Sequence, residues 1–293
     1  MPSCSKSPGE HSLARRLHQS CLTLRERTGW TIDRHEQRLR RAAYEPLTVR
    51  VLTINAHKGF TPFNRRFILP ELREAVRATA ADVVFLQEVL GSHAGHANRL
   101  INWPEVPQYE FLADEMWPEF AYGRNAVYPN GHHGNALLSK YPIVAYENLD
   151  VSLSDAEKRG ALHCVLRLPQ QNAEMHVVCV HFGLSEAHRR AQTQLLCDRL
   201  QSHVPRGTPL IVAGDFNDWR LQTHATLATD CGLKEAFAEL SGELPRTFPA
   251  RWPLLALDRV YLKNASVRRA RVLSNRPWSH LSDHAPLAVE LAL

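Results

Sequence analysis

The stretch that most constrains this chain is a short apolar strand that ends in a carboxylate and an amide. Residues 209–213 follow the breaker Gly207 and have the apolar, β-branched composition of a buried strand. Asp215 and Asn217 come directly after it, and two alternate residues of an extended segment point to the same side. This pair suits Mg²⁺, Mn²⁺ or the orientation of a phosphate, although a turn in which Asp and Asn cap the next helix has the same residues.

Other predicted strands end in the same way. Apolar, β-rich runs predict strands, and the main ones cover residues 47–54, 82–86, 175–180, 257–262 and 285–293. Amphipathic helices are predicted over 70–80 and 186–204, whereas residues 91–130 are expected to be irregular and rich in aromatic side chains. The polar residues at or just beyond the strand ends are Asn55, Glu88, His181, Asp215, Asn217, Asp258, Asp283 and His284.

So many oxygen-bearing and imidazole side chains at strand ends predict one rim where two packed sheets meet. The sequence has no G-x-S-x-G nucleophile motif and no G-x-x-x-x-G-K phosphate loop. The residue types therefore favour phosphoryl chemistry that uses a hard metal ion and water as the nucleophile. Each residue also has a structural interpretation: Asn55 could cap its strand, and His181 could be a core histidine.

The basic residues are unevenly distributed. Residues 1–45 contain nine Lys/Arg and five Asp/Glu residues, so this leader carries +4 of the formal net charge of +5. We expect the leader to be a solvated tail or a surface helix that contacts an anionic membrane. The nearly neutral body argues against a dedicated DNA-binding groove, which needs a basic footprint. The acidic, aromatic segment 91–130 would instead suit a pocket wall for a small or partly apolar substrate.

The cysteines and the apolar runs bear on the compartment. No run reaches the roughly 20 apolar residues of a membrane span, and the N-terminus shows no apolar signal segment. The six cysteines contain no C-x-x-C pair. Cys164 and Cys179 lie inside apolar strand-like runs, so we interpret them as small core residues in a reducing compartment. These features predict a cytoplasmic monomer, peripheral to the membrane if the leader binds lipid.

In their order along the chain, these motifs closely resemble the endonuclease/exonuclease/phosphatase superfamily of metal-dependent phosphodiesterases. The motifs are Thr53-Ile54-Asn55, Leu86-Gln87-Glu88, Gly134-Asn135-Ala136-Leu137-Leu138-Ser139, His181-Phe182-Gly183, Gly214-Asp215-Phe216-Asn217, Leu257-Asp258-Arg259-Val260 and Ser282-Asp283-His284. The resemblance covers about residues 47–293 and is strongest to a bacterial branch whose genes can lie beside cardiolipin synthases. It implies an α+β fold, a four-layer α/β/β/α sandwich of two mixed sheets flanked by helices. The leader would be 1–45 and the catalytic domain 46–293.

The resemblance also implies a metal site and a general base. Glu88 would bind Mg²⁺ or Mn²⁺, with Asn55 beside it and Asp283 nearby. His284 would take a proton from the attacking water, and Asp258 would hold its imidazole in the right tautomer.

Other residues would contact the phosphate. His181 would donate a hydrogen bond to the phosphate or help protonate the leaving oxygen. Asp215 and Asn217 would orient water, phosphate or a second metal ion. Three residues are candidates for substrate binding: Asn135, His133 and Arg159. His132 is a further candidate for contact with the substrate phosphate, although His132 and His133 could instead belong to a flexible Gly-rich loop. Three residues are candidates for the pocket edge: His57, Lys58 and Trp219.

These inferences predict a divalent-metal-dependent hydrolase of phosphate esters that acts on a small or lipid-linked substrate. One alternative is an endonuclease or exonuclease of the same mechanism that acts on DNA or RNA through a basic stripe hidden in the net charge. Another is an inactive binding module, which the complete set of metal and base residues disfavours.

Overall fold

Strand β1 (Thr48–Asn55) sends successive side chains to opposite faces, and this alternation separates the layers of the fold. Val49 and Val51 pack in the cluster shared by the two sheets. Leu52 and Ile54 point the other way and pack under helices. Both faces of this strand are therefore buried, as expected for the centre of a sheet covered on each side.

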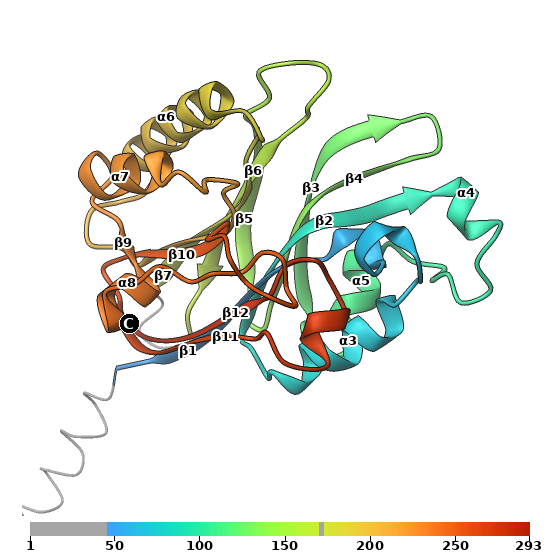
Figure 1. Cartoon of the computed structure of the whole chain (residues 1–293). Helices are drawn as coiled ribbons and strands as arrows, with labels where there is room; N and C mark the ends of the chain where they lie inside the picture. Colours follow the sequence, from blue (N-terminus) through green and yellow to red (C-terminus); the bar gives the residue numbers. More distant parts are fainter. Residues whose placement is uncertain (1–45, 170–172) are drawn as a thin grey trace, which may run out of the picture. The chain divides into compact units, whose positions relative to one another are not determined.

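The structure is a computed structural model that describes residues 46–169 and 173–293. The other strands are β2 (Val83–His93), β3 (Glu119–Tyr128), β4 (Gly131–Ser139), β5 (Ile143–Asp150), β6 (Gly160–Arg167), β7 (Glu174–His181), β8 (Leu210–Asp215), β9 (Lys234–Glu235), β10 (Asp258–Lys263), β11 (Ser266–Val272) and β12 (Leu287–Ala292). They form two six-stranded sheets, ordered β11-β12-β1-β2-β4-β3 and β5-β6-β7-β8-β10-β9 (Figure 1). The pairs β1–β2 and β7–β8 are parallel and their neighbours are antiparallel, so both sheets are mixed.

Helices cover the outer face of each sheet. On the first sheet, α3 (Leu69–Ala78) and α5 (Gln108–Ala113) bury Leu69, Leu72 and Leu112 against β1 and β2. On the second, α6 (Glu186–His203) and α7 (Gln222–Thr229) bury Leu196 and Leu227 (Figure 1). Shorter elements are α4 (Ala94–Ala97), α8 (Ala236–Ser241) and the 3-10 turns η1 (His57–Gly59), η2 (Pro62–Asn64) and η3 (Trp278–His280). The predicted four-layer sandwich is confirmed.

The expectation of an irregular segment over residues 91–130 is wrong. Strand β2 continues to His93, two short helices follow, and β3 pairs with β4 along its length. Strand β3 lies at the edge of the first sheet and its side chains are mostly half-buried. An edge strand with weak burial on both faces has little alternation in its sequence, which explains why the pattern did not reveal it.

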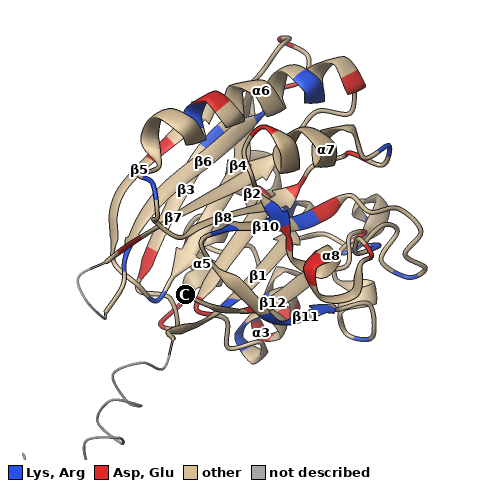
Figure 2. Ribbon diagram, turned by 90° about the vertical axis from the view of Figure 1, so that its left-hand side faces the viewer, with Lys and Arg blue, Asp and Glu red and all other residues tan. Residues whose placement is uncertain are grey.

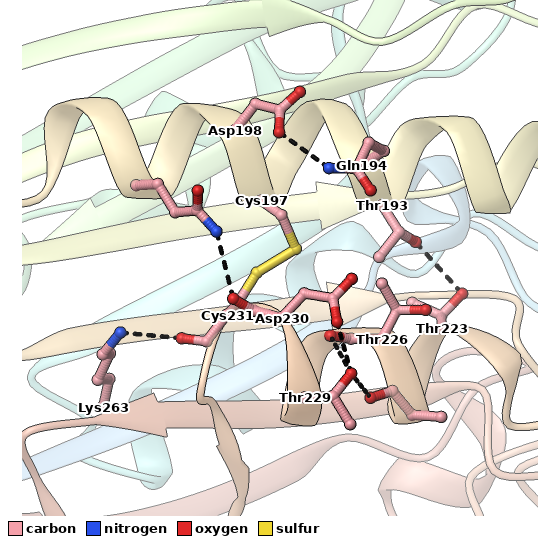
Figure 3. The surroundings of a disulfide bond; sticks show 12 residues. Thr193, Gln194, Cys197, Asp198, Thr223, Thr226, Thr229, Asp230, Cys231 and Lys263 are labelled. Atoms are coloured by element: carbon pink, nitrogen blue, oxygen red, sulfur yellow. Dashed lines mark hydrogen bonds between the residues drawn. A yellow bond between two sulfur atoms is a disulfide. The ribbon is translucent and has the colours of Figure 1, made fainter.

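The cysteines follow the prediction only in part. Cys164 and Cys179 are buried and free, as expected of small core residues. In contrast, Cys197 on α6 forms a disulfide with Cys231, which follows α7, and Lys263 Nζ donates a hydrogen bond to the Cys231 carbonyl (2.9 Å; Figure 3). The sequence made no prediction for these two cysteines, so their disulfide is a feature that it missed.

Residues Leu47–Leu293 form one compact unit. The predictions made for residues 1–45 lie outside the described residues. None of the helices in the described ranges is long and apolar enough to span a membrane.

Candidate active site

The strand register brings the predicted residues of the second sheet together. Strand β8 lies between β7 and β10, and its last residue Asp215 is paired with His181 on one side and Asp258 on the other. The residue before it, Gly214, has φ +145°, and a Cβ there would lie 2.0 Å from the Val180 carbonyl oxygen. Only glycine fits this close approach of the two strands.

Asn55 connects this group to the first sheet. Its Nδ2 donates to Asp215 Oδ2 across the two sheets (3.3 Å) and lies 3.5 Å from Glu88 Oε1. Its Oδ1 accepts a hydrogen bond from the His57 backbone N–H (3.1 Å). The end of β1 therefore holds the two carboxylates of Glu88 and Asp215 around a single amide, at the rim predicted from the sequence.

Glu88 occupies a bulge in β2. The register with β4 shifts between Leu86 and Val89, and Glu88 has φ +54°, a left-handed conformation that costs energy for a side chain of this kind. Burial raises the pKa of Glu88, but the positive charges of His181 and Lys58 outweigh burial and lower this pKa to about 2. Lys58 Nζ lies 3.2 Å from Glu88 Oε2. The bulge thus directs the ionised carboxylate of Glu88 toward the site.

Asp258 and His284 form a buried pair. The carboxylate Oδ2 of Asp258 lies 2.8 Å from His284 Nδ1, and His284 Nε2 lies 3.9 Å from Asp215 Oδ2. Burial alone would lower the pKa of His284, but the charges of Asp258 and Asp215 outweigh it and raise the pKa to about 10. His284 is therefore a strong base whose Nε2 faces the other carboxylate of the site.

His181 has the opposite character. Its Nε2 lies 3.6 Å from Asp215 Oδ2 and 4.0 Å from Glu88 Oε1. Burial, helped by the charge of Arg159, lowers the pKa of His181 to about 4. The imidazole is neutral at physiological pH and carries one N–H that can be donated. The two histidines of the site are thus tuned in opposite directions, which is the pattern of an acid–base pair.

Asn217 and Arg159 converge on one backbone carbonyl. Asn217 Nδ2 donates to the Phe182 oxygen (2.9 Å), and Arg159 Nε donates to the same oxygen (3.1 Å). A second guanidinium nitrogen of Arg159 donates to Glu157 Oε1 (3.0 Å). Asn217 has φ +49°, which also places it in the left-handed region. Both predicted residues therefore lie beside His181, with much of their hydrogen-bonding capacity used by the protein.

The two other candidates for substrate contact differ from each other. Burial lowers the pKa of half-buried His133 to about 4. The charges of Lys58 and Arg159 lower this pKa further, and the charge of Glu88 opposes them. Asn135 is fully buried (0% exposed), and its amide donates to the carbonyls of Gly160 (2.8 Å) and Cys179 (3.2 Å) in the other sheet. The structure thus places His133 at the site, and Asn135 between the sheets.

The turn after β1 adds two residues that the sequence placed only at the pocket edge. His57 Nδ1 lies 3.1 Å from Asp283 Oδ1, and Lys58 contacts Glu88 as described above. His57 and Lys58 have φ +43° and +57°. Trp219 is half exposed, with the Arg220 guanidinium 4.4 Å from its ring centroid. His132 instead hydrogen-bonds the Tyr122 hydroxyl (2.9 Å).

Sequence reasoning missed a buried ion pair below the site. Arg259, adjacent to Asp258, is 0% exposed and donates to Asp218 Oδ2 (3.0 Å) and to the Asp218 and Ala256 carbonyls (2.6 and 3.0 Å). It joins the loop after β8 to the start of β10, the two segments that carry Asp215 and Asp258. An arginine inside an otherwise apolar strand is the signal that could have revealed it.

The donor set fits a hard divalent cation. The carboxylates of Glu88 and Asp215 meet at the Asn55 amide, and burial raises the pKa of Asp215, so its charged form needs a cationic partner. In the described residues, one ligand atom each from Asp215, Asp258 and His284 also lies within 4.8 Å of the others. Carboxylate oxygens are among the ligands that Mg²⁺ and Mn²⁺ prefer.

Comparisons with known proteins agree with this geometry. A protein from Escherichia coli (strain K12) called "Uncharacterized protein YbhP" is 56% identical over 249 residues, which are 85% of this chain and 98% of that protein. The solved mannosyl-6-phosphatase of Bacteroides thetaiotaomicron superposes with a TM-score of 0.65 at 18% identity, over 84% of this chain and 100% of that one. TDP2 of D. rerio, solved with a single-strand DNA product, superposes with a TM-score of 0.64 at 14% identity, over 84% of this chain and 99% of that one.

These two structures share the fold at low sequence identity, and the family is shown by the sequence itself. The model of the Endonuclease/Exonuclease/phosphatase family matches residues 52–284, a range that begins in β1 and ends at His284. The chain therefore belongs to the Endonuclease/Exonuclease/phosphatase family.

Proposed function

We propose that this protein is a divalent-metal-dependent hydrolase of phosphate esters in which His284 activates a water molecule. The observation that carries the proposal is the Asp258–His284 pair, whose 2.8 Å contact lies beside Asp215 and His181. One solved structure of this fold is named a mannosyl-6-phosphatase, and the proposal brings the same class of substrate, a phosphate ester, to this chain. The opposite pKa changes of His181 and His284 supply the acid–base machinery that such a reaction needs.

The mechanism follows from the ring nitrogens. Asp258 accepts a hydrogen bond from the Nδ1–H group of His284, so the neutral imidazole keeps its lone pair on Nε2, the nitrogen that faces the site. Nε2 can then take a proton from a water molecule that attacks the phosphorus atom, while the bond from phosphorus to the ester oxygen breaks. The ester oxygen leaves as an alcohol after it takes up a proton from solvent or with the help of His181. The resulting imidazolium is stabilised by the carboxylates of Asp258 and Asp215.

His181 would act on the other side of the phosphate. Its neutral ring can donate a hydrogen bond to a phosphoryl oxygen, where negative charge develops in the transition state. Glu88 and Asp215 would hold Mg²⁺ or Mn²⁺, with Asn55 beside them and Asp283 nearby. When bound, the cation supplies Lewis-acid stabilisation of the phosphoryl oxygens.

The pH profile gives one prediction. The rate should rise as His284 loses its proton. Burial lowers the pKa of His284, but the charges of Asp258 and Asp215 outweigh it and raise that pKa. Asp258→Asn removes one negative charge, so the ascending limb should move to lower pH by about 1–3 pH units. The plateau should also fall, because Nδ1 loses its carboxylate acceptor. Profiles of kcat/KM against pH with saturating Mg²⁺ measure both effects, and an unmoved limb would contradict this role for the pair.

A nuclease of the same mechanism is the second candidate, since one structure of this fold was solved with a single-strand DNA product. The distribution of charge speaks against it. Acidic and basic residues are interspersed along α6 and the strands behind it (Figure 2), and Glu186 pairs with both Arg190 and Arg220. A groove that follows a phosphate backbone needs a continuous basic stripe.

Plasmid DNA and a generic phosphodiester, bis(p-nitrophenyl) phosphate, separate the candidates. Both should be incubated with the purified protein and Mg²⁺ or Mn²⁺, with His284→Ala in parallel. We expect hydrolysis of the small ester that disappears in the variant, with little nicking of the plasmid. Nicking that disappears in the variant would make the nuclease activity primary. If the wild type hydrolyses neither substrate, the inactive binding module becomes the better description.

A further inference from the structure

A cavity of about 1160 Å³ opens beside the active site. Three segments far apart in sequence form it: residues 57–71, 248–252 and 276–283. His57 and Asp283, which contact each other at 3.1 Å next to Glu88, belong to its lining. A substrate whose phosphate lies at Glu88 and His284 can therefore extend its remaining part into this cavity.

The wall of this cavity is mainly apolar. Ile68, Phe248, Pro249 and Leu281 line it together with the ring of Pro277. Cavities that bind ligands commonly have such walls with a few polar groups for orientation. This apolar part of the lining suits an apolar group attached to the phosphate.

Large apolar side chains stand exposed at the mouth of the cavity. Phe63 is 83% exposed and Trp252 is 76% exposed, and Leu254, on the same loop as Trp252, is 66% exposed. Phe63 sits at the tip of η2 with φ +64°, so the turn holds this aromatic ring outward in a strained conformation. Grouped exposed apolar side chains of this size mark an interaction site.

Arginines surround these apolar side chains. Arg65, Arg251 and Arg276 line the cavity and are exposed, and no ion pair is found for them in the described residues. The Arg65 guanidinium lies 5.4 Å from the Phe63 ring centroid. Arg66, by contrast, is paired with Glu71. The mouth therefore combines apolar tips with unpaired positive charge, the combination by which proteins bind the surface of an anionic membrane.

We propose that the cavity mouth, formed by Phe63, Trp252, Arg65, Arg251 and Arg276, docks on an anionic phospholipid bilayer and that the substrate is a phospholipid of that surface. The inference rests on the proposed function, because it assigns the substrate of the same site. The arginines would bind lipid phosphates while the apolar tips enter the interface. The lipid ester would reach Glu88 and His284, and its apolar part would occupy the cavity.

Single-stranded nucleic acid is the competing ligand, since arginines and exposed rings also stack bases. The structure favours lipid in two respects. The exposed surface of the wall behind the rings is mainly apolar, so it offers a base few hydrogen-bonding partners. The exposed side chain that accompanies the rings, Leu254, is aliphatic and has no face on which a base can stack.

The test is co-sedimentation of the full chain with vesicles of phosphatidylglycerol mixed with phosphatidylethanolamine, compared with vesicles of phosphatidylcholine. We expect preferential binding to the anionic vesicles. The double variant Phe63→Ala/Trp252→Ala should bind about tenfold or more weakly, since each ring loses its burial in the interface. The matched controls are Tyr146→Ala, an exposed aromatic on β5, and Arg269→Ala/Arg271→Ala, two exposed arginines on β11, which should bind like the wild type.

Measurements of hydrolysis distinguish the docking proposal from the proposed function on which it rests. The double variant should keep wild-type hydrolysis of the soluble ester bis(p-nitrophenyl) phosphate and lose hydrolysis of vesicle lipid. Unchanged vesicle binding in the double variant would overturn the docking surface. Binding to a single-stranded oligonucleotide should be measured in parallel, and a double variant that loses binding to the oligonucleotide but not to vesicles would also overturn it. If the wild type hydrolyses no ester at all, the proposed function fails, and with it the assignment of the substrate, whatever the vesicles show.

Discussion

Replacing His284 by alanine is expected to lower kcat/KM by about 10²–10⁴-fold, the contribution of a positioned general base. No other base in the described part of the chain is placed to substitute for it. His181 is neutral with a pKa lowered to about 4 by burial, so it is a much weaker base. The measurement is steady-state hydrolysis of a generic phosphodiester with saturating Mg²⁺ or Mn²⁺.

The loss must come from chemistry and not from unfolding. The ring centroids of His284 and Phe248 lie 5.0 Å apart, and His284 neutralises two buried carboxylates. The circular dichroism and melting temperature of the His284→Ala protein should therefore be compared with those of the wild type. His203→Ala, at the exposed end of α6, is the matched control and should retain full activity. A folded His284→Ala protein with wild-type kcat/KM would exclude His284 as the base.

Replacing Arg259 by methionine should lower the free energy of unfolding by about 3–5 kcal/mol, because the carboxylate of Asp218 would be left buried without its partner. Both side chains are fully buried, and the guanidinium holds the loop after β8 through the Asp218 carbonyl as well. Asp218 also accepts backbone N–H groups of Gln222 and His224 at the start of α7. Urea unfolding monitored by fluorescence measures the change.

A second substitution distinguishes the buried charge from lost packing. In Asp218→Asn/Arg259→Met no unpaired charge remains, so we expect the double variant to be more stable than Arg259→Met alone. Arg269→Met on exposed β11 should change the free energy of unfolding by less than about 0.5 kcal/mol. A double variant that is no more stable than Arg259→Met would mean that the unpaired charge of Asp218 is not the cause of the loss.

The residues at strand ends were the part of the site that the sequence could predict. Alternation and β-branched composition locate the strands, and residues that end neighbouring strands lie together once the strands are paired, as His181, Asp215 and Asp258 do. The same reasoning could not place Glu88, because its direction depends on a bulge and a left-handed backbone at a non-glycine residue. Nor could it separate His133, which lies close enough to Lys58 and Glu88 for their charges to act on it, from Asn135, whose amide donates to carbonyls of the other sheet.

Features built from distant segments were beyond the sequence. The Cys197–Cys231 disulfide spans 34 residues and depends on how α7 packs on α6, which no spacing rule reveals. The cavity depends on three loops whose residues carry no periodic signal, so the arginines and aromatic rings at its mouth looked like scattered surface residues. Strand β3 was missed for the related reason that an edge strand has little alternation.

The most direct measurement is the metal dependence of phosphodiester hydrolysis, with Glu88→Gln beside the wild type. The protein would be stripped with a chelator, assayed with bis(p-nitrophenyl) phosphate, and assayed again after Mg²⁺ or Mn²⁺ is restored. We predict no hydrolysis by the stripped protein, recovery with either cation, and a rate at least about 10²-fold lower in Glu88→Gln at the same cation concentration. Hydrolysis that persists in the chelator, or a Glu88→Gln protein as active as the wild type, would contradict a metal-dependent reaction at this site.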